Sequence, residues 1–242
     1  MNADILVIGA HPDDIELSCG ATVATLVRQG LRVVLADLTE GELGTRGTRE
    51  IRAREARQAA EILGVAARRN LGIQDGNIEI NKTNLHQVIS LIRELTPSIV
   101  ICPHSFDRHP DHVHAHQLTR EAWFYAGLAK MTTTLRGKEQ KPHRPDNWFE
   151  FMQWHEFTPS FIVDVSETWE VKMKAVHAYE SQFFRKESDE PETKLSKPEF
   201  LDLVQTRGRA YGHKIGVQFG EPFYSPVPIG ISRFTDLLLT KG

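Results

Sequence analysis

Short apolar runs alternate with amphipathic segments along the first hundred residues of the chain. The runs at 5–8, 33–36 and 99–102 are continuously apolar, which is typical of strands buried on both faces of a parallel sheet. Between them, residues 20–29 and 85–95 carry apolar side chains at helical spacing. This order of strands and helices predicts an α/β fold built on a mostly parallel sheet.

The second half of the chain has a different pattern. Aromatic and polar residues alternate over 148–154 and 161–165, which predicts an extension of the sheet. We expect one helix over about 167–181, and a second over about 196–211 that opens with the capping box Ser-Lys-Pro-Glu. A final short strand is expected at 217–219.

Two segments lack the regular apolar positions of a packed element. Residues 131–147 are polar and rich in lysine, and they are interpreted as a long excursion rather than a domain boundary. Residues 185–194 are dense in charge. We interpret this second segment as the most mobile part of the chain and as a candidate lid.

The composition fits one α/β domain that spans residues 1–242. The chain is 40% hydrophobic and 25% charged, which is enough apolar material for a sizeable core. A net charge of −3 gives no basic footprint for nucleic acid, and no apolar stretch approaches the roughly 20 residues of a membrane span. Two cysteines are too few for a disulfide framework. We therefore expect a cytoplasmic protein that binds neither nucleic acid nor membranes.

Three polar side chains follow the first apolar run directly. His11 and Asp14 stand three positions apart on a turn stiffened by Pro12, at the end of the strand where open α/β sheets place their chemistry. An imidazole and a carboxylate so spaced can converge on one cation, which leaves Asp13 free to act on a bound molecule. A helix N-cap and a structural histidine are the alternatives for this motif taken alone.

A second His-Pro-Asp unit follows the apolar run at 99–102. It consists of His109, Pro110 and Asp111, and His112 comes directly after it. Because two strand ends of a parallel sheet can face the same crevice, His112 is the natural third ligand beside the first motif. Two imidazoles and one carboxylate with an open position for water are typical of a catalytic zinc site.

Other polar residues near these motifs are interpreted as structural. His112 and His116 share a helical face, but Val113 stands where a zincin motif requires glutamate. We therefore expect His114 and His116 to pack in the interior or to lie at the surface. The Asp-Gly pair at 75–76 could also present a carboxylate to the site, but it is interpreted as a structural turn.

The A-H-P-D-D element from Ala10 to Asp14, together with the H-P-D-H element from His109 to His112, resembles the LmbE-like (PIG-L) family of zinc-dependent N-acetylglucosamine deacetylases. Further stretches are similar to one branch, the bacillithiol-biosynthesis deacetylases that act on N-acetylglucosaminyl-malate; these stretches are 37–48, 70–72, 178–183 and 216–223. The resemblance implies a Rossmann-like three-layer sandwich, a zinc cofactor, a small-molecule glycoside substrate and a homo-oligomer, either a trimer or a hexamer.

The same residues predict roles in amide hydrolysis. Three protein ligands leave zinc an open site, where the pKa of bound water falls toward roughly 7. Asp13 is the expected general base, because Asp14 beside it is held by the metal. We expect a protonated His109 to stabilise the oxyanion, as the resemblance also implies, and Asp111 to orient one of the imidazoles.

Two arginines are expected to bind the substrate. Arg108 adjoins His109, and Arg52 matches a family position near the substrate, with an exposed ion pair as its alternative role. A guanidinium suits a carboxylate, so such a cationic rim favours the two carboxylates of a malyl group over a neutral oligosaccharide. Where some family members have a tyrosine near the start of the last helix, this chain has Phe200, which offers no hydroxyl group.

Three alternatives to a malate-specific deacetylase stay open. The substrate could be another N-acetylglucosamine compound, either a chito-oligosaccharide or another glycoconjugate. A non-haem Fe(II) oxygenase also uses two histidines and one carboxylate, but it has no need for a free base beside its ligand. A zinc-stabilised sugar-binding module would leave Asp13 idle. Release of acetate distinguishes either kind of deacetylase from the last two classes.

Overall fold

A seven-stranded sheet forms the centre of the structure, a computed structural model that describes residues 2–183 and 189–237. The strands lie in the order β3-β2-β1-β4-β7-β9-β8. The first five of these are parallel, and β9 pairs antiparallel with both β7 and β8. Their bounds are β1 Ile5–Gly9, β2 Val33–Thr39, β3 Ala67–Ile73, β4 Ile99–Pro103, β7 Asn147–Phe151, β8 Phe161–Asp164 and β9 Gly220–Tyr224. The mostly parallel sheet predicted from the sequence is confirmed.

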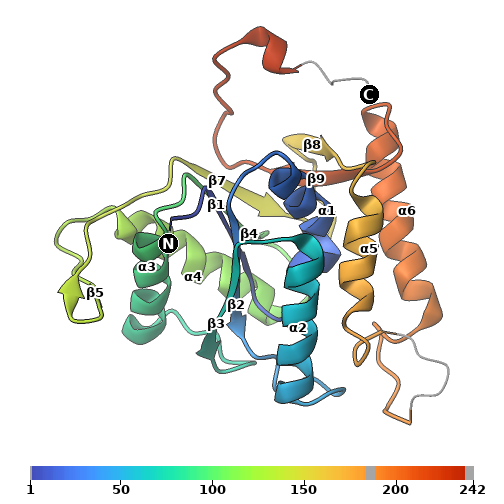
Figure 1. Ribbon diagram of the computed structural model, residues 1–242, viewed down its shortest axis with the longest axis horizontal. Helices are drawn as coiled ribbons and strands as arrows, with labels where there is room; N and C mark the ends of the chain where they lie inside the picture. Colours follow the sequence, from blue (N-terminus) through green and yellow to red (C-terminus); the bar gives the residue numbers. More distant parts are fainter. Residues whose placement is uncertain (1, 184–188, 238–242) are drawn as a thin grey trace.

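Helices cover both faces of this sheet (Figure 1). The apolar side chains of β1 alternate between the two layers: Leu6 and Ile8 pack with the core under α3 and α4, whereas Ile5 and Val7 pack with the core under α1, α2 and α5. The helix bounds are α1 Asp14–Arg28, α2 Arg49–Leu63, α3 Lys82–Leu95, α4 Pro110–Ala126, α5 Trp169–His177 and α6 Pro198–Lys214. The three-layer α/β sandwich is therefore confirmed.

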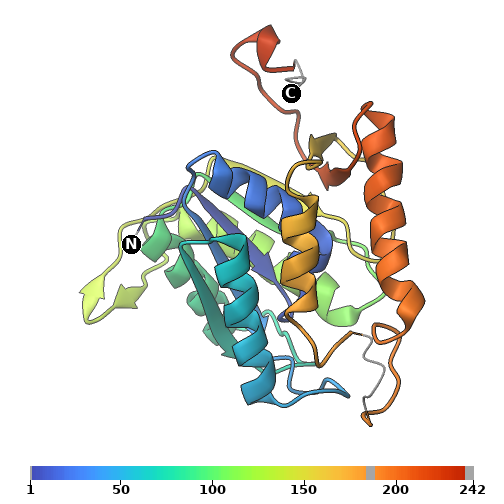
Figure 2. The ribbon, with the colours of Figure 1, turned by 45° about the vertical axis from the view of Figure 1, so that its right-hand side comes forward.

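Smaller elements lie outside the central sheet and its covering helices. The polar excursion after α4 contains a short hairpin, β5 Thr134–Leu135 and β6 Lys138–Glu139. The described C-terminal segment carries the 3-10 helix η1 (Phe234–Leu237) and extends away from the sheet (Figure 2). Within the described residues, no helix is both long enough and apolar enough to span a bilayer. Residues 185–188 of the candidate lid lie outside the described residues.

The strand order determines where a site can form. β1 pairs with β2 on one side and with β4 on the other, so the chain changes direction across the sheet at β1. Ligands of open α/β sheets bind at such a switch point, in the crevice outside the carboxyl ends of the strands. The turns that follow β1 and β4 meet at this crevice, and they carry the two polar motifs.

Several element boundaries differ from the prediction: β7 ends at Phe151 rather than at 154, α5 ends at His177 rather than near 181, and two further differences lie at α1 and β9. α1 begins at Asp14 rather than at residue 20, because its first turn carries the acidic residues Asp14 and Glu16 in place of an apolar rhythm. β9 begins at Gly220, three residues after the start of the predicted strand. Gly220 and Pro222 have low strand propensity, but antiparallel pairing with β8 overrides it.

The predicted capping box before α6 is also wrong. The helix begins at Pro198, and the N-cap residue Lys197 makes no side-chain capping bond. The Ser196 hydroxyl donates instead to the Thr193 carbonyl at 3.1 Å, within the loop that precedes the helix. Proline at the first helical position is enough to start α6, since it leaves no amide hydrogen without a partner.

Glu221 of β9 supports a break inside α1. Cys19 has non-helical dihedral angles, φ −136° and ψ 22°, so the helix begins again after it. The backbone N–H groups of Ala21 and Thr22 donate to the Glu221 carboxylate at 3.2 and 2.7 Å. Lys172 of α5 donates to the same carboxylate at 2.6 Å, and both charged side chains are buried. One carboxylate therefore joins α1, α5 and β9.

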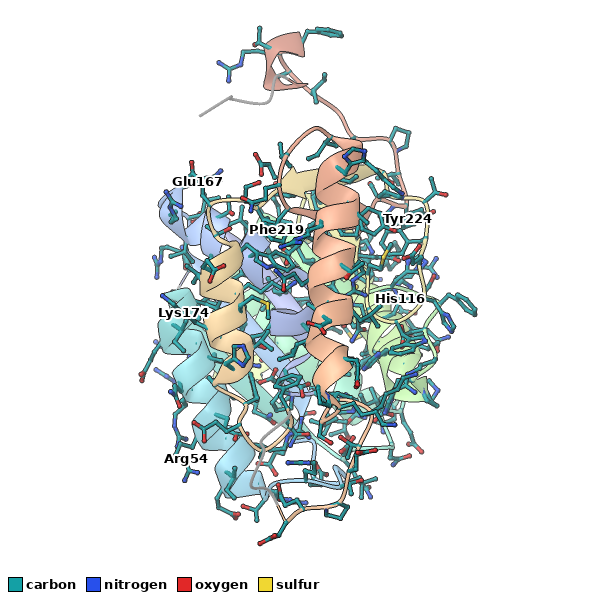
Figure 3. All side chains as sticks on the ribbon, turned by 90° about the vertical axis from the view of Figure 1, so that its right-hand side faces the viewer. Arg54, His116, Glu167, Lys174, Phe219 and Tyr224 are labelled. Carbon is teal, nitrogen blue, oxygen red and sulfur yellow. The ribbon has the colours of Figure 1, made fainter. Side chains whose placement is uncertain are left out.

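Replacing this carboxylate should destabilise the fold strongly. We expect Glu221→Ala to lower the free energy of unfolding by about 3–5 kcal/mol, because the buried Lys172 ammonium loses its counter-charge. Urea denaturation measures the loss. The control is Glu167→Ala, since Glu167 lies at the surface (Figure 3) and pairs with Arg28 in an exposed contact of 2.8 Å. Such a pair contributes under about 1 kcal/mol, and equal losses in both variants would contradict this account.

Candidate active site

A strained turn joins β1 to α1. The last residue before the helix, Asp13, has a φ of 106°, far inside the region that only glycine adopts readily. The backbone N–H of His11 donates to Asp14 Oδ2 at 2.8 Å, which closes the turn over Pro12. Strain of this kind persists only where the surroundings hold it, and it is concentrated at functional sites.

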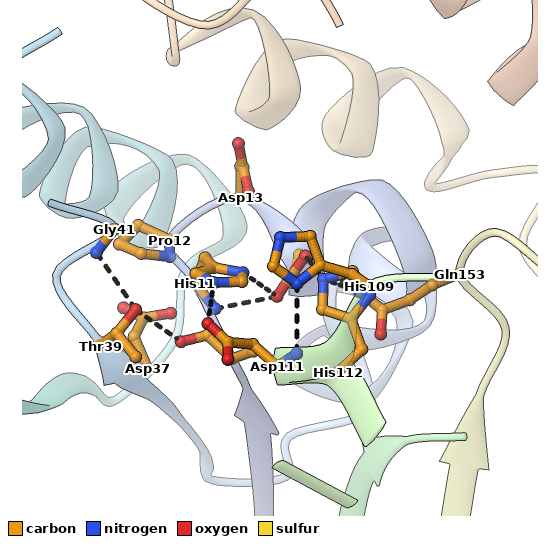
Figure 4. Close-up of polar contacts among 12 residues, drawn as sticks. His11, Pro12, Asp13, Asp37, Thr39, Gly41, His109, Asp111, His112 and Gln153 are labelled. Atoms are coloured by element: carbon orange, nitrogen blue, oxygen red, sulfur yellow. Dashed lines mark hydrogen bonds and ion pairs between the residues drawn. The ribbon is translucent and has the colours of Figure 1, made fainter. Parts of the chain in front are cut away.

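Three side chains converge beside this turn, as the sequence predicts. Ligand-type atoms of His11, Asp14 and His112 all lie within 4.8 Å of one another, so this set could hold a metal ion. His112 Nε2 is 3.1 Å from Asp14 Oδ1, and His11 Nδ1 is 3.4 Å from Asp14 Oδ2. Figure 4 shows the two imidazoles, His11 from the turn after β1 and His112 from the first turn of α4.

Carboxylates on the far side of each imidazole orient the ring. Asp107 Oδ1 lies 2.9 Å from His112 Nδ1, which places the proton on Nδ1 and leaves Nε2 free to bind a cation. Burial alone would lower the pKa of His112, yet the charge of Asp14 and the hydrogen bond to Asp107 raise that pKa to about 9. Surroundings that favour a positive charge so strongly suit a bound cation.

The turn after β3 brings another carboxylate to the site. Asp75 Oδ1 lies 3.0 Å from His11 Nε2, and Asp111 Oδ2 lies 3.2 Å from the same nitrogen. The backbone N–H of Gly76 donates to Asp111 Oδ2 at 2.8 Å, which fixes that carboxylate. The interpretation of the turn at 75–76 as only structural is therefore wrong. The sequence holds a turn signal there, but only the β3–β2–β1 order shows that it faces His11.

Asp13 stands apart from the other drawn residues (Figure 4) and lines the cavity, with the Arg52 guanidinium 3.6 Å from its Oδ2. It is 5% exposed and makes no side-chain capping bond to α1. Burial raises the pKa of this carboxyl to about 7, against the opposing effect of the Arg52 guanidinium. A buried carboxylate with a raised pKa is suited to proton transfer near neutral pH.

Arg52 is buried under the turn instead of lying on an exposed rim. Its Nη2 donates to the Pro12 carbonyl at 2.7 Å, and its Nη1 donates to the Gly41 carbonyl at 2.8 Å. Nη2 is also 3.6 Å from Asp13 Oδ2. The guanidinium therefore ties the strained turn to the loop after β2. These contacts do not support the expected grip of Arg52 on a substrate carboxylate, and they do not support an exposed ion pair either.

His109 forms the N-cap of α4. Its Nδ1 accepts the backbone N–H of Asp111 at 3.2 Å, so Nδ1 carries no proton. Burial and the neighbouring His11 and His112 lower the pKa of His109. These features do not support the expected protonated imidazole, and they favour a neutral ring with its proton on Nε2. A neutral ring still offers one N–H donor.

A cavity of about 770 Å³ opens over these residues. Its lining includes Arg108, whose guanidinium stacks on the Trp154 ring at 4.5 Å. Phe200 also lines the cavity, as do Leu43 and Gly44 of the glycine-rich loop after β2. The cavity is large enough for a disaccharide-sized ligand.

Two further histidines of α4 behave as expected. His116 is buried, with Nδ1 3.1 Å from the Pro103 carbonyl and its ring edge against Trp148. His114 is exposed. Neither belongs to a group of potential ligands found among the described residues, so their interpretation as packing and surface residues is confirmed.

One residue at the centre of the site was missed in the sequence. Gln153 follows β7, and its Nε2 lies 2.9 Å from Asp14 Oδ1 and 3.2 Å from His112 Nε2. Nothing in the sequence near residue 153 resembles a ligand motif. The feature that places Gln153 at the site is the strand order of the sheet. β7 pairs in parallel with β4, so both strands end at the same crevice.

Comparisons with known proteins extend over most of the chain. The family model PIG-L, described as GlcNAc-PI de-N-acetylase, matches residues 6–123. The diacetylchitobiose deacetylase of Thermococcus kodakarensis is 31% identical over 227 residues, which cover 89% of this chain and 82% of that protein. The crystal structure of a conserved protein from Thermus thermophilus matches with a TM-score of 0.85 at 36% identity, over 96% of this chain and 98% of that one. A probable N-acetyl-α-D-glucosaminyl L-malate deacetylase of Bacillus cereus is 31% identical over 125 residues, 46% of this chain and 57% of that protein.

The convergence of ligand atoms predicts how metal content responds to mutation. We expect His112→Ala to lose most of the bound metal, since it removes one of the three ligand side chains. The matched control is His116→Ala, one turn further along α4, which removes a buried imidazole outside the set. Elemental analysis of both purified variants measures the metal per chain. Full occupancy in His112→Ala would exclude His112 as a ligand.

Proposed function

Because this chain belongs to the PIG-L family of GlcNAc-PI de-N-acetylases, we propose that it is a zinc-dependent hydrolase that removes the N-acetyl group from a substrate containing N-acetylglucosamine. The observation that carries this proposal is the convergence of His11, Asp14 and His112 beside Asp13. All four side chains line one cavity at the carboxyl ends of β1 and β4.

The donor set fits zinc. Two neutral imidazoles and one carboxylate are typical of catalytic zinc sites, and each imidazole here has a carboxylate on its other nitrogen. When bound, zinc would supply a Lewis acid that polarises the acetyl carbonyl and lowers the pKa of water to about 7.

Asp13 is the proposed general base. Its carboxylate takes a proton from the water molecule whose oxygen attacks the acetyl carbon. The carbon–nitrogen bond then breaks, and the protonated Asp13 returns the proton to the leaving nitrogen, which yields acetate and a free amine on the glucosamine unit of the substrate. The burial that raises the Asp13 pKa to about 7 makes both transfers accessible near neutral pH.

His109 is the proposed donor to the oxyanion. The Asp111 N–H fixes its ring through Nδ1, so the remaining proton on Nε2 is available to the developing negative charge on the acetyl oxygen. Asp111 also accepts from Gly76 N–H and lies against His11, which supports its proposed role as the residue that orients this imidazole.

The proposed substrate is N-acetylglucosaminyl-L-malate. Arg108 lines the cavity, and no carboxylate of the described chain lies within ion-pairing distance of it, so its charge is available to an anionic substrate. The second candidate is a neutral oligosaccharide of N-acetylglucosamine. It is favoured by the much longer match to a diacetylchitobiose deacetylase.

The proposed cellular location and oligomeric state follow from the composition and from the family resemblance. We propose a cytoplasmic homo-oligomer, a trimer or a hexamer, that acts on a small glycoside. The Fe(II) oxygenase and the sugar-binding module lose support, since the matched relatives are named as deacetylases.

Removal of the base should separate metal binding from hydrolysis. We expect Asp13→Asn to keep its zinc but to lose about 10²-fold or more in kcat, because an amide of the same size cannot accept the proton. Acetate release and zinc content are measured on the same preparation. Near-normal turnover would assign the base to another group that lines the cavity.

Loss of the oxyanion donor should affect kcat alone. We expect His109→Ala to lower kcat by about 10²–10³-fold at unchanged zinc content, the usual loss for one such donor. Because the imidazole is neutral in the resting site, the variant should keep the alkaline side of the pH–rate profile of the wild type. Disappearance of that limb in His109→Ala would show that a protonated His109 is required.

The two arginines should behave differently toward a malyl group. We expect Arg108→Ala to lower kcat/KM for N-acetylglucosaminyl-malate while hydrolysis of free N-acetylglucosamine changes little. Arg52→Ala should lower kcat/KM for both substrates, since it releases the Pro12 carbonyl next to Asp13. If Arg108→Ala lowers kcat/KM equally for both substrates, the neutral oligosaccharide becomes the better assignment.

A further inference from the structure

Gln153 lies in the position of a fourth group around the candidate metal set. Its side-chain amide is 2.9 Å from Asp14 Oδ1 and 3.2 Å from His112 Nε2, and these two atoms are 3.1 Å from each other. Neighbouring ligand atoms around one zinc ion, with bonds of about 2.0–2.2 Å, lie roughly 3.0–3.5 Å apart. The amide thus has the spacing of a ligand toward two proposed ligands at once.

The amide nitrogen is suited to this position only while no cation is bound. Its Nε2 donates to the Asp14 carboxylate, and the same nitrogen lies against His112 Nε2. A cation held by the same two atoms would repel an N–H and attract a carbonyl oxygen. The orientation of the amide should therefore depend on the metal.

The oxygen atom of the Gln153 amide lacks a hydrogen-bond donor among the described residues. Gln153 Oε1 is buried and has no hydrogen-bond partner within the described part of the chain. Leaving a buried polar atom unpaired costs free energy, so such an atom calls for an explanation. A half-turn about the last side-chain bond exchanges oxygen and nitrogen, which are nearly the same size, and brings Oε1 toward Asp14 and His112.

The scaffold holds Gln153 in place from two sides. Arg207 of α6 donates its Nη1 to the Gln153 backbone carbonyl. On the next residue, the Trp154 backbone N–H donates to Asp107 Oδ2 at 2.7 Å, and the other oxygen of Asp107 orients His112. The segment after β7 is therefore positioned by the same carboxylate that positions a proposed ligand. Only the amide is left to turn.

We propose that Gln153 is a fourth, exchangeable metal ligand, which binds through Oε1 when no substrate is present and gives way to the acetamide of the substrate. This rests on the metal site of the proposed function. An amide oxygen carries no net charge. It would therefore add to the metal affinity of the other three ligands, yet bind weakly enough for the carbonyl oxygen of the substrate to replace it.

The test compares zinc affinity and cobalt absorption spectra in three variants. Gln153→Leu keeps the size of the side chain but has no oxygen, whereas Gln153→Glu keeps an oxygen and has no N–H. Gln182→Leu is the matched control, because Gln182 lines the same cavity but donates its amide to the Arg46 carbonyl at 2.8 Å. Competition with a chelator gives the zinc Kd, and thermal unfolding of the metal-free proteins shows that each variant is folded.

We expect Gln153→Leu to bind zinc about 10- to 100-fold more weakly than the wild type, while Gln153→Glu binds at least as tightly. The visible absorption maxima of the cobalt-loaded protein should shift in Gln153→Leu, because water replaces the amide oxygen. Gln182→Leu should match the wild type in both measurements.

Two results would overturn the proposal. Unchanged zinc affinity in Gln153→Leu would show that the amide contributes nothing to binding. Weaker affinity with an unchanged cobalt spectrum would show that Gln153 only supports Asp14 through its N–H. Both results leave the deacetylase proposal intact, since wild-type protein that binds no zinc at all is the separate result that contradicts the metal site itself.

Discussion

The site depends on one strained turn. β1 delivers the chain into the middle of the sheet, and α1 must begin within about five residues of its end. Asp13 absorbs the change of direction with a φ of 106°, a conformation that costs a residue with a side chain on the order of 1–3 kcal/mol. Arg52 holds the Pro12 carbonyl directly before it, so the strain is maintained by a buried guanidinium. The result is that His11, Asp13 and Asp14 all face one crevice.

Buried charge is the second constraint on this molecule. Three carboxylates of the site are nearly inaccessible to water: Asp13, Asp14 and Asp111. Their neighbours are imidazoles, and the one nearby guanidinium among the described contacts is that of Arg52. Carboxylates buried at this density are unfavourable unless a positive charge compensates them. A divalent cation at His11, Asp14 and His112 would supply that charge. The electrostatics of the site therefore favour a bound cation, as the ligand geometry also does.

Much of this arrangement could be predicted from the sequence, because the relevant signals are local. Continuous apolar runs marked β1, β2 and β4, and each of the two motifs follows such a run. The residues that the sequence missed come from elements whose neighbours are set by the sheet order. Asp75 and Gln153 reach the site only because β3 and β7 end at the same edge as β1 and β4. The N-cap hydrogen bond to His109 Nδ1 is likewise encoded by no motif.

The central claim is that metal-dependent amide hydrolysis takes place at the crevice between β1 and β4. The most direct measurement is acetate release from N-acetylglucosaminyl-malate and from diacetylchitobiose, by chelator-stripped protein and by the same protein after zinc is restored. We predict that stripped protein is inactive, and that restored protein releases one acetate for each free amine formed on at least one of the two substrates. Equal activity with and without metal, or no acetate from either substrate, would contradict this account.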